Sequence, residues 1–380
     1  MPRAEGRMPR STRAARAPAP RRLRVPLGPR GYDVVLADDF AALPAALAPL
    51  RLGRRAFVLT DRNVHPLYGR PLVTSLRRAG LDVRMAVIPA GERQKSLERL
   101  GWVLTHLVTA GIERGDTFFT LGGGVIGDLG GFAAATYLRG IACVQVPTTL
   151  LAMVDSAVGG KVGVNLASGK NLVGAFHQPR LVYAPLSTLA TLPGREFRSG
   201  LAEVIKAGMI GDRTLLVHLE RSLEDILALS PAALTEAVAR AVQLKARVVA
   251  ADEREAGLRA ILNYGHTVGH AMEAATAYRR FRHGEAVALG MVAAGRLALA
   301  LGLCGPETVA RQDLLLARAG LPLGVSNLPR ERVLAAIERD KKARGGRLRF
   351  VLAPRVGSAR LHEGPPMTLV ARAIASLVLK

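Results

Sequence analysis

The stretch Thr117-Phe-Phe-Thr-Leu-Gly122-Gly-Gly-Val-Ile-Gly-Asp128-Leu-Gly-Gly131 decides the fold of this chain. A β-prone run turns abruptly into glycines, and a helix is predicted to follow at 132–137. Glycines let the backbone approach an anionic group closely, and a helix N-terminus presents free N–H donors to it. The pattern therefore indicates pyrophosphate binding by a dinucleotide. It differs from Gly-x-Gly-x-x-Gly and follows a third or fourth strand instead of the first.

Alternating strands and helices surround this stretch. Apolar runs that end on polar residues, as strands do at the ligand edge of a parallel sheet, alternate with helical periodicity. Strand, helix, strand order predicts right-handed βαβ units and a Rossmann-like, mostly parallel sheet. Strands are expected at 32–37, 55–61, 82–88, 117–122 and 141–146, and helices at 71–79 and 97–110.

The pattern changes at Arg195. Periods of 3.6 residues predict helices at 196–209, 213–229, 231–250 and after 263, with one late strand at 347–352. We therefore predict an α/β nucleotide-binding domain over residues 31–194 and an all-α or mainly α-helical metal- and substrate-binding domain over 195–380.

The first thirty residues are predicted to be a disordered tail rich in arginine and proline. They hold nine arginines against one acid, Glu5, out of a formal net charge of +23, and show no helical or strand period. A nucleic-acid or membrane-surface role lacks the support of interleaved aromatic residues. An organellar transit peptide would be richer in serine, and Met8 is an alternative start.

The cysteine content and the hydropathy of the sequence indicate the cellular location of the protein. Cys143 and Cys304 cannot form a disulfide framework, so a reducing, cytoplasmic setting is expected. The longest apolar run, 286–303, is broken by Arg296. A membrane span needs about 20 apolar residues with few charges, so this run is predicted to be a buried helix.

Three histidines lie within eighteen positions in Asn263-Tyr-Gly-His266-Thr-Val-Gly-His270 and His283-Gly-Glu285. His266 and His270 share one helix face. Clustered imidazoles can bind zinc when a carboxylate from elsewhere completes the site. The alternative is a helix whose histidines are hydrogen-bonded without a metal.

Glu203 lies among apolar residues in Gly200-Leu-Ala-Glu203-Val-Ile-Lys206. A carboxylate there is costly to bury unless it is paired or bound to a metal. Its neighbour three residues on, Lys206, offers the alternative of a simple ion pair.

Polar residues in glycine-rich backbone are candidates for phosphate binding. Lys161, Lys170 and Asn171 lie in a glycine-rich segment that is an oxyanion cradle or, alternatively, a plain surface loop. Glu92 and Lys95 precede one expected helix, and Thr148 and Thr149 precede another. These four are candidates for nucleotide contacts, with ordinary helix capping as the alternative.

Seven motifs, in order and at matching spacing over about residues 32–365, resemble 3-dehydroquinate synthase. They are Gly122-Gly-Gly-Val-Ile-Gly-Asp128, Val146-Pro-Thr-Thr149, Val154-Asp-Ser-Ala-Val-Gly-Gly-Lys161, Gly169-Lys-Asn171, Gly200-Leu-Ala-Glu-Val-Ile-Lys206, Asn263-Tyr-Gly-His-Thr-Val-Gly-His270 and His283-Gly-Glu-Ala-Val287. The chain departs from that family in its tail, its arginine content and Ala90, where aspartate is common.

The resemblance implies the residues of a complete active site. It implies a divalent metal, zinc or alternatively cobalt, on Glu203, His266 and His283, so that His270 is not a ligand. The residues implied to hold the substrate phosphate are Lys161, Asn171, Asn263, His270 and one of Lys341 or Lys342. Lys245 and Arg259 are implied to hold the substrate carboxylate, and Asp155 and Lys206 its hydroxyls. Arg139 is implied to reach the phosphate from a partner subunit. Residues implied to contact NAD are Ala90, Gly91, Glu92, Arg93, Gln94, Lys95, Gly124, Val125, Ile126, Gly127, Asp128, Thr148, Thr149, Lys161, Lys170, Thr188, Leu189, Ala190 and Thr191.

The resemblance also implies a homodimer and a reaction. A phosphorylated keto acid, 3-deoxy-D-arabino-heptulosonate 7-phosphate, would be oxidised by NAD, lose phosphate, be reduced again and close its carbocycle. Three alternatives stay open. They are a sister sugar-phosphate cyclase, a metal-dependent polyol dehydrogenase that releases NADH, and a nucleic-acid-binding role for the tail.

Overall fold

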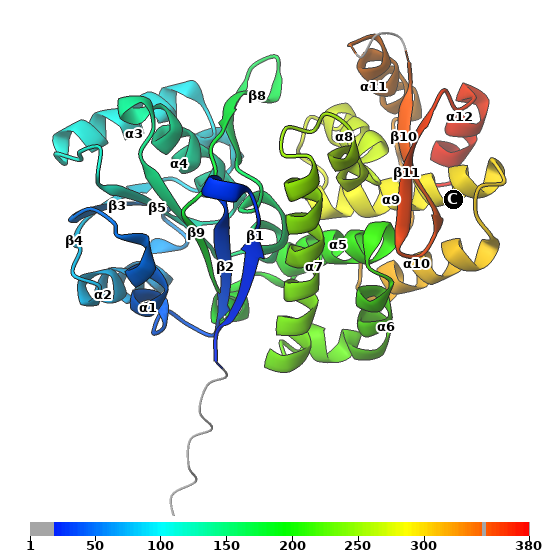
Figure 1. The fold of residues 1–380 in the computed structure, drawn as a ribbon. Coiled ribbons are helices and arrows are strands. Elements are labelled where there is room, and N and C mark those ends of the chain that lie inside the picture. Colours follow the sequence, from blue (N-terminus) through cyan, green and yellow to red (C-terminus); the bar gives the residue numbers. More distant parts are fainter. Residues whose placement is uncertain (1–18, 344–346, 380) are drawn as a thin grey trace, which may run out of the picture.

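The computed structural model describes residues 19–343 and 347–379, with the side chains of 340–343 left out. An α/β half carries one seven-stranded sheet, and a helical half packs beside it (Figure 1). The sheet order is β1-β2-β9-β6-β5-β3-β4, and every pairing but β1–β2 is parallel. The predicted fold class is confirmed. The strand bounds are β1 Arg21–Val25, β2 Tyr32–Ala37, β3 Arg55–Asp61, β4 Asp82–Ile88, β5 Thr117–Gly122, β6 Ala142–Pro147 and β9 Leu181–Pro185.

Helices cover both faces of this sheet. Helices α1 (Leu43–Leu47) and α2 (Arg70–Arg78) pack on one face, and α3 (Leu97–Thr109) and α4 (Gly124–Thr136) pack on the other. Strand β3 pairs with both β4 and β5, so the chain reverses its crossover direction there. Ligands of open α/β sheets bind at such a switch point, beyond the carboxyl ends of the strands.

The predicted tail is wrong for its last part, because β1 belongs to the sheet. Its sequence Arg22-Leu-Arg-Val25 alternates, so that Leu23 and Val25 are buried against the helical half while the arginines face outward. Strand β1 pairs antiparallel with β2, Leu23 opposite Val34. The arginines masked an ordinary period-2 pattern. The remainder of the predicted tail, residues 1–18, lies outside the described residues.

Helix α4 begins inside the glycine run, at Gly124, earlier than the predicted start at 132. A β-carbon on Gly130 would lie 2.6 Å from Thr120 Cγ2, and one on Gly131 would lie 2.4 Å from Val162 Cγ1. Gly130 therefore lets the helix pack closely on β5 of the sheet, and Gly131 lets it pack closely on β7 (Lys161–Leu166). This role is distinct from the anion binding predicted for the run. The segment predicted as a loop after Val158 is instead a hairpin of β7 (Lys161–Leu166) and β8 (Gly169–Phe176).

The helical half begins with α5, close to the predicted boundary. One apolar cluster joins it to strands β1, β2 and β9, so the two halves share a core. No described helix is both long and apolar enough to cross a membrane. The helices of the helical half are α5 Gly194–Gly211, α6 Arg213–Leu227, α7 Pro231–Ala251, α8 His266–Ala275, α9 His283–Ala300, α10 Pro306–Arg318, α11 Arg330–Ala343 and α12 Met367–Ala375. This half also contains a hairpin of β10 (Arg349–Arg355) and β11 (Ser358–Glu363), of which only the first strand was predicted.

Close contact between α8 and α9 makes a testable prediction. A β-carbon on Gly290 would lie 1.8 Å from the Gly265 carbonyl oxygen. Gly290→Ala should therefore push the two helices apart and lower the free energy of unfolding by about 3 kcal/mol. The matched control is Gly101→Ala in α3, where nothing lies within 4 Å. That change should be neutral or stabilising by up to about 1 kcal/mol. Equal melting temperatures for the two variants would contradict this packing.

Candidate metal and nucleotide site

Three helices bring Glu203, His266 and His283 together, a set we call the metal triad. Glu203 lies midway along α5, and the two histidines are the first residues of α8 and α9. Glu203 Oε1 lies 3.7 Å from His266 Nε2 and 3.6 Å from His283 Nε2. One oxygen and two nitrogens that converge in this way form the ligand set of a zinc site with an open position.

The two carboxylate oxygens of Glu203 have different surroundings. Oε2 forms an ion pair with Lys206, whereas Oε1 is buried and has no hydrogen-bond partner among the described residues. Burial alone would raise the pKa of Glu203, but Lys206 and the two histidines outweigh it and hold that pKa well below its usual value. The predicted ion pair with Lys206 is therefore present beside the candidate metal site. A cation fits the unpartnered oxygen.

The histidine rings are held in ligand orientation. His266 Nδ1 lies 3.2 Å from the Tyr264 carbonyl oxygen, so this nitrogen is the donor and Nε2 keeps its lone pair toward Glu203. Burial and Lys206 hold the pKa of His266 well below its usual value. His283 Nδ1 lies 3.5 Å from Glu273 Oε2. Burial lowers the pKa of His283, but Glu203 and Glu273 overcome this and raise it to about 10. Glu273 carries no signal in the local sequence that predicts this role.

His270 lies beside the metal triad. Its ring centroid is 5.1 Å from that of His266 and 6.0 Å from that of His283. His270, Glu273 and His283 form a second set whose ligand atoms also come within reach of one ion. The two sets share His283. The buried, unpartnered Oε1 of Glu203 favours the first set, because an unpaired buried oxygen is costly without a cation.

A cavity of about 550 Å³, which we call the inner cavity, brings together five of the predicted substrate and catalytic residues. Lys245 Nζ donates to the Asp155 carboxylate and, at 2.5 Å, to the Asp155 carbonyl oxygen. Arg259 is 2% exposed, and its guanidinium donates to the carbonyl oxygens of Glu253 (2.5 Å) and Gly159 (3.2 Å). The five residues are Asp155, Lys161, Asn171, Lys245 and Arg259.

Glu255 also lines the inner cavity and was missed by the sequence analysis. It pairs with Lys161 and accepts a hydrogen bond of 2.9 Å from Asn263 Nδ2, two residues predicted to hold phosphate. Burial opposes its ionisation, but the hydrogen bonds from Lys161 and Asn263 lower its pKa. A bound phosphate and this carboxylate would compete for the same two donors. An acidic neighbour of this kind leaves no signal in the local sequence.

A second cavity of about 740 Å³, the outer cavity, lies between the hairpin of β7 and β8 and the segment from the end of α8 to the start of α9. Glu92, Lys95, Lys170 and His283 line it. Lys95 is 5% exposed, and its Nζ donates to Asp128 Oδ2 at 2.5 Å and to Asn171. Asn165 Nδ2 donates to Glu92 Oε1 at 2.8 Å. This network ties the predicted nucleotide segments 90–95 and 124–128 to the hairpin.

The N-terminus of α4 suits an anionic group of a nucleotide. No side chain caps it, and a β-carbon on its N-cap residue Gly123 would lie 3.1 Å from Thr149 Cγ2. Segments 90–95, 124–128, 148–149 and 188–191 each follow a parallel strand, so they share the ligand edge of the sheet. The chain's donors and its lack of side-chain bulk there fit a dinucleotide.

Most of the remaining predicted residues lie outside the two cavities, whereas Lys170 lines the outer cavity. Thr191 Oγ1 lies 2.6 Å from Tyr68 Oη, and Ala190 lines a separate cavity. Lys170 Nζ lies 3.7 Å from Glu273 Oε1 and 4.1 Å from the ring centre of Tyr278. Arg139 is exposed at the far end of α4, away from the glycine run. The predicted substrate contacts Lys341 and Lys342 lie outside the residues whose side chains are described.

Family models cover most of the chain. The model of the 3-dehydroquinate synthase N-terminal domain matches residues 85–199, and that of the C-terminal domain matches residues 200–343. The chain belongs to the 3-dehydroquinate synthase family. It is 45% identical over 359 residues to 3-dehydroquinate synthase of Nostoc punctiforme, covering 93% of this chain and 99% of that protein. It is 48% identical over 362 residues to that of Rhizobium rhizogenes, covering 93% and 96%.

Solved structures of other sugar-phosphate cyclases share the fold of this family member. The 2-epi-5-epi-valiolone synthase ValA of Streptomyces hygroscopicus, with NAD+ and Zn2+ bound, has a TM-score of 0.84 and 30% identity, covering 91% of this chain and 96% of that one. A 2-deoxy-scyllo-inosose synthase complexed with carbaglucose-6-phosphate, NAD+ and Co2+ has a TM-score of 0.85 and 26% identity, covering 94% and 100%.

Proposed function

We propose that this family member is an NAD- and metal-dependent 3-dehydroquinate synthase. It converts 3-deoxy-D-arabino-heptulosonate 7-phosphate to 3-dehydroquinate and phosphate, the second step of the shikimate pathway. The observation that carries the proposal is the match of both domain models, together with curated relatives at 43–51% identity. The metal triad and the uncapped N-terminus of α4 support the cofactor requirement.

We assign the cofactors as follows. Glu203, His266 and His283 would hold zinc or cobalt, and the edge formed by 90–95, 124–128, 148–149 and 188–191 would hold NAD. When bound, the metal would ease deprotonation of a substrate hydroxyl, and NAD+ would accept and return the hydride. The charges of Glu203 and Lys206 both influence the pKa of Asp155. Burial opposes its ionisation, but Lys245 lowers its pKa, so it is an anion able to accept a hydrogen bond from a hydroxyl.

The inner cavity would orient the substrate by charge. Lys245 and Arg259 are almost fully buried, and burial lowers the pKa of each. A substrate carboxylate would compensate their charge. Lys161, Asn171, Asn263 and His270 would hold the phosphate, with Glu255 displaced. The contribution of these groups is positioning and electrostatic stabilisation of the leaving phosphate.

The carboxylate-binding role also separates this function from its closest alternative. Sister cyclases such as 2-deoxy-scyllo-inosose synthase act on sugar phosphates without the carboxylate. Lys245 is already paired with Asp155, but among the described residues the buried guanidinium of Arg259 donates hydrogen bonds only to main-chain carbonyl oxygens. Those substrates would leave Arg259 without a carboxylate partner, which favours the keto acid.

Assembly and location are part of the proposal. We assign a homodimer in which Arg139 reaches the phosphate site of the partner. Its support is that Arg139 has a φ of 67° and an exposed side chain with no partner among the described residues. Light scattering on the eluted protein should give twice the chain mass of 40.3 kDa. The unpaired cysteines Cys143 and Cys304 support a cytoplasmic location, without a membrane or a specific nucleic acid as partner.

A phosphate-release assay tests the function. The heptulosonate phosphate should release phosphate without accumulation of NADH, and a chelator should abolish the release. Glucose 6-phosphate and sedoheptulose 7-phosphate should release none. Turnover of either sugar phosphate would make the chain a sister cyclase, and accumulating NADH would make it a dehydrogenase.

His270 provides a test of the ligand assignment. His270→Ala should retain one zinc per chain but lower kcat/KM by about 10²-fold, since one phosphate-binding hydrogen bond to a charged group is lost. Zinc is measured by atomic absorption on dialysed protein. Loss of the metal in this variant would make His270, Glu273 and His283 the true ligand set.

A further inference from the structure

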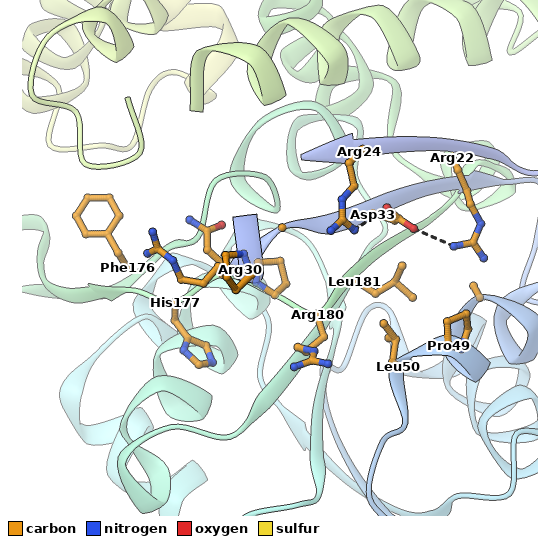
Figure 2. A pocket seen from close by; sticks show the side chains of 15 residues that line it. Arg22, Arg24, Arg30, Asp33, Pro49, Leu50, Phe176, His177, Arg180 and Leu181 are labelled. Atoms are coloured by element: carbon orange, nitrogen blue, oxygen red, sulfur yellow. Dashed lines mark hydrogen bonds and ion pairs between the residues drawn. The ribbon is translucent and has the colours of Figure 1, made fainter. Parts of the chain in front are cut away.

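A basic cavity lies outside the active site, and we call it the arginine pocket. Its volume is about 360 Å³, and its walls come from β1, β2, the start of β9 and the end of β8. Arg22, Arg24, Arg30 and Arg180 line it, with Asp33 as its one carboxylate. Figure 2 shows Arg22 and Arg24 reaching the same Asp33, each at 3.0 Å.

The positive charge of the pocket is only partly compensated. One carboxylate serves two guanidinium groups, and within the described residues the Arg180 guanidinium has no hydrogen-bond or ion-pair partner. Leu50, Pro49 and Leu181 supply an apolar wall opposite the charges. A concave site lined by four arginines and an apolar wall suits a small organic anion with two or more charged oxygen groups.

The fourth arginine connects this pocket to the inner cavity. Arg30 binds the carboxylate of Glu253 through Nη1 at 2.9 Å and Nη2 at 2.7 Å. The same carboxylate accepts a hydrogen bond of 2.8 Å from Gln178 Nε2, and the Glu253 carbonyl oxygen accepts from Arg259 Nη1. Phe176 lines both cavities. A ligand that attracts Arg30 therefore acts directly on the residue that holds Arg259.

We propose that the arginine pocket is a second anion site, which takes a small polycarboxylate or phosphate ester and weakens substrate binding when it is filled. The anion competes with Glu253 for Arg30. Once released, Glu253 and its main chain hold Arg259 less firmly, so the substrate carboxylate is bound less tightly. The binding half of this inference stands on the pocket alone, and the coupling half rests on the proposed role of Arg259.

Calorimetric titration of the enzyme loaded with NAD+ and zinc tests the binding half. Fructose 1,6-bisphosphate represents phosphate esters and tricarballylate represents polycarboxylates, and binding of only one of them identifies the ligand class. Lys161→Met removes competing binding in the inner cavity and should leave the second site intact. Arg22→Gln combined with Arg180→Gln should weaken that site by about tenfold or more, because two charge-assisted contacts are lost. Asp33 keeps Arg24 as partner in this variant.

The matched control is Arg77→Gln combined with Arg78→Gln, which removes the same charge from exposed positions at the end of α2. It should bind the titrants as the wild type does. Equal weakening in the control would mean that overall charge, not the pocket, binds the anion. If neither titrant binds the wild type at millimolar concentration, the site does not exist.

Kinetics test the coupling half. A saturating titrant should raise KM for the heptulosonate phosphate severalfold with kcat unchanged, and saturating substrate should weaken the titrant by the same factor. Glu253→Gln should keep titrant binding but abolish its effect on KM. A titrant that binds in the pocket and leaves KM unchanged would overturn the coupling. Absence of turnover on any substrate would instead fail the proposed function, while calorimetry still reports on the pocket.

Discussion

Glu203→Ala is expected to remove the bound metal and to lower kcat/KM by at least about 10³-fold, because two imidazoles alone leave the site incomplete. Metal content is measured by atomic absorption after dialysis, beside the wild type at one zinc per chain. Lys206 is 3% exposed and would lose its ion-pair partner in this variant, so lower stability is also expected.

A double variant separates metal loss from unfolding. Glu203→Gln with Lys206→Met removes both buried charges at nearly constant volume, so the fold should persist while zinc is lost. Glu220→Ala is the control, since among the described residues this carboxylate pairs only with Arg311 of α10, and it lies outside the metal triad. It should keep its zinc. A full complement of zinc in folded Glu203→Gln/Lys206→Met would refute the ligand assignment.

Lys161→Met should weaken binding of phosphate-bearing substrate analogues by about 50-fold, equivalent to about 2 kcal/mol for a lost charged hydrogen bond. The affinity for NAD+ should change by less than about threefold, because other donors hold the nucleotide. Part of the loss should come from Glu255, which keeps its charge in the inner cavity without its cation. Fluorescence titration of each ligand gives the dissociation constants.

The double variant Lys161→Met/Glu255→Gln measures the part of the affinity loss that comes from Glu255. It should bind phosphate-bearing analogues more tightly than Lys161→Met alone, by about 1 kcal/mol or more, because the unpaired carboxylate of Glu255 is also removed. Equal losses for NAD+ and for the phosphate-bearing analogues would place Lys161 in the nucleotide site instead.

The parts of the site that carry a local signal could be read from the sequence. The glycine run predicted an anion site at a strand end. Glu203 was a candidate ligand because a lone carboxylate among apolar residues is costly to bury. Spacing alone did not predict which two histidines lie nearest Glu203. His266 and His270 share a helix face, yet the unpartnered oxygen of Glu203 lies between His266 and His283, which begin different helices. Only the resemblance to the family made that choice.

Other features depend on contacts between segments distant in the sequence. Glu253, Glu255 and Glu273 are ordinary acidic residues until the fold places them against Arg30, Lys161 and His283. The strand β1 was missed because three arginines hid an alternation of only two apolar residues. The hairpin of β7 and β8 was missed because its many glycines resemble those of a loop. Its Gly163 and Gly174 instead allow the two strands to approach closely.

Anomalous X-ray scattering at the zinc edge, from crystals grown with NAD+ and zinc, tests the central claim most directly. The predicted result is one strong peak about 2.0–2.2 Å from Glu203 Oε1, His266 Nε2 and His283 Nε2. It should face the nicotinamide of an NAD+ whose pyrophosphate lies at the N-terminus of α4. A peak between His270, Glu273 and His283, or no peak at saturating zinc, would contradict it.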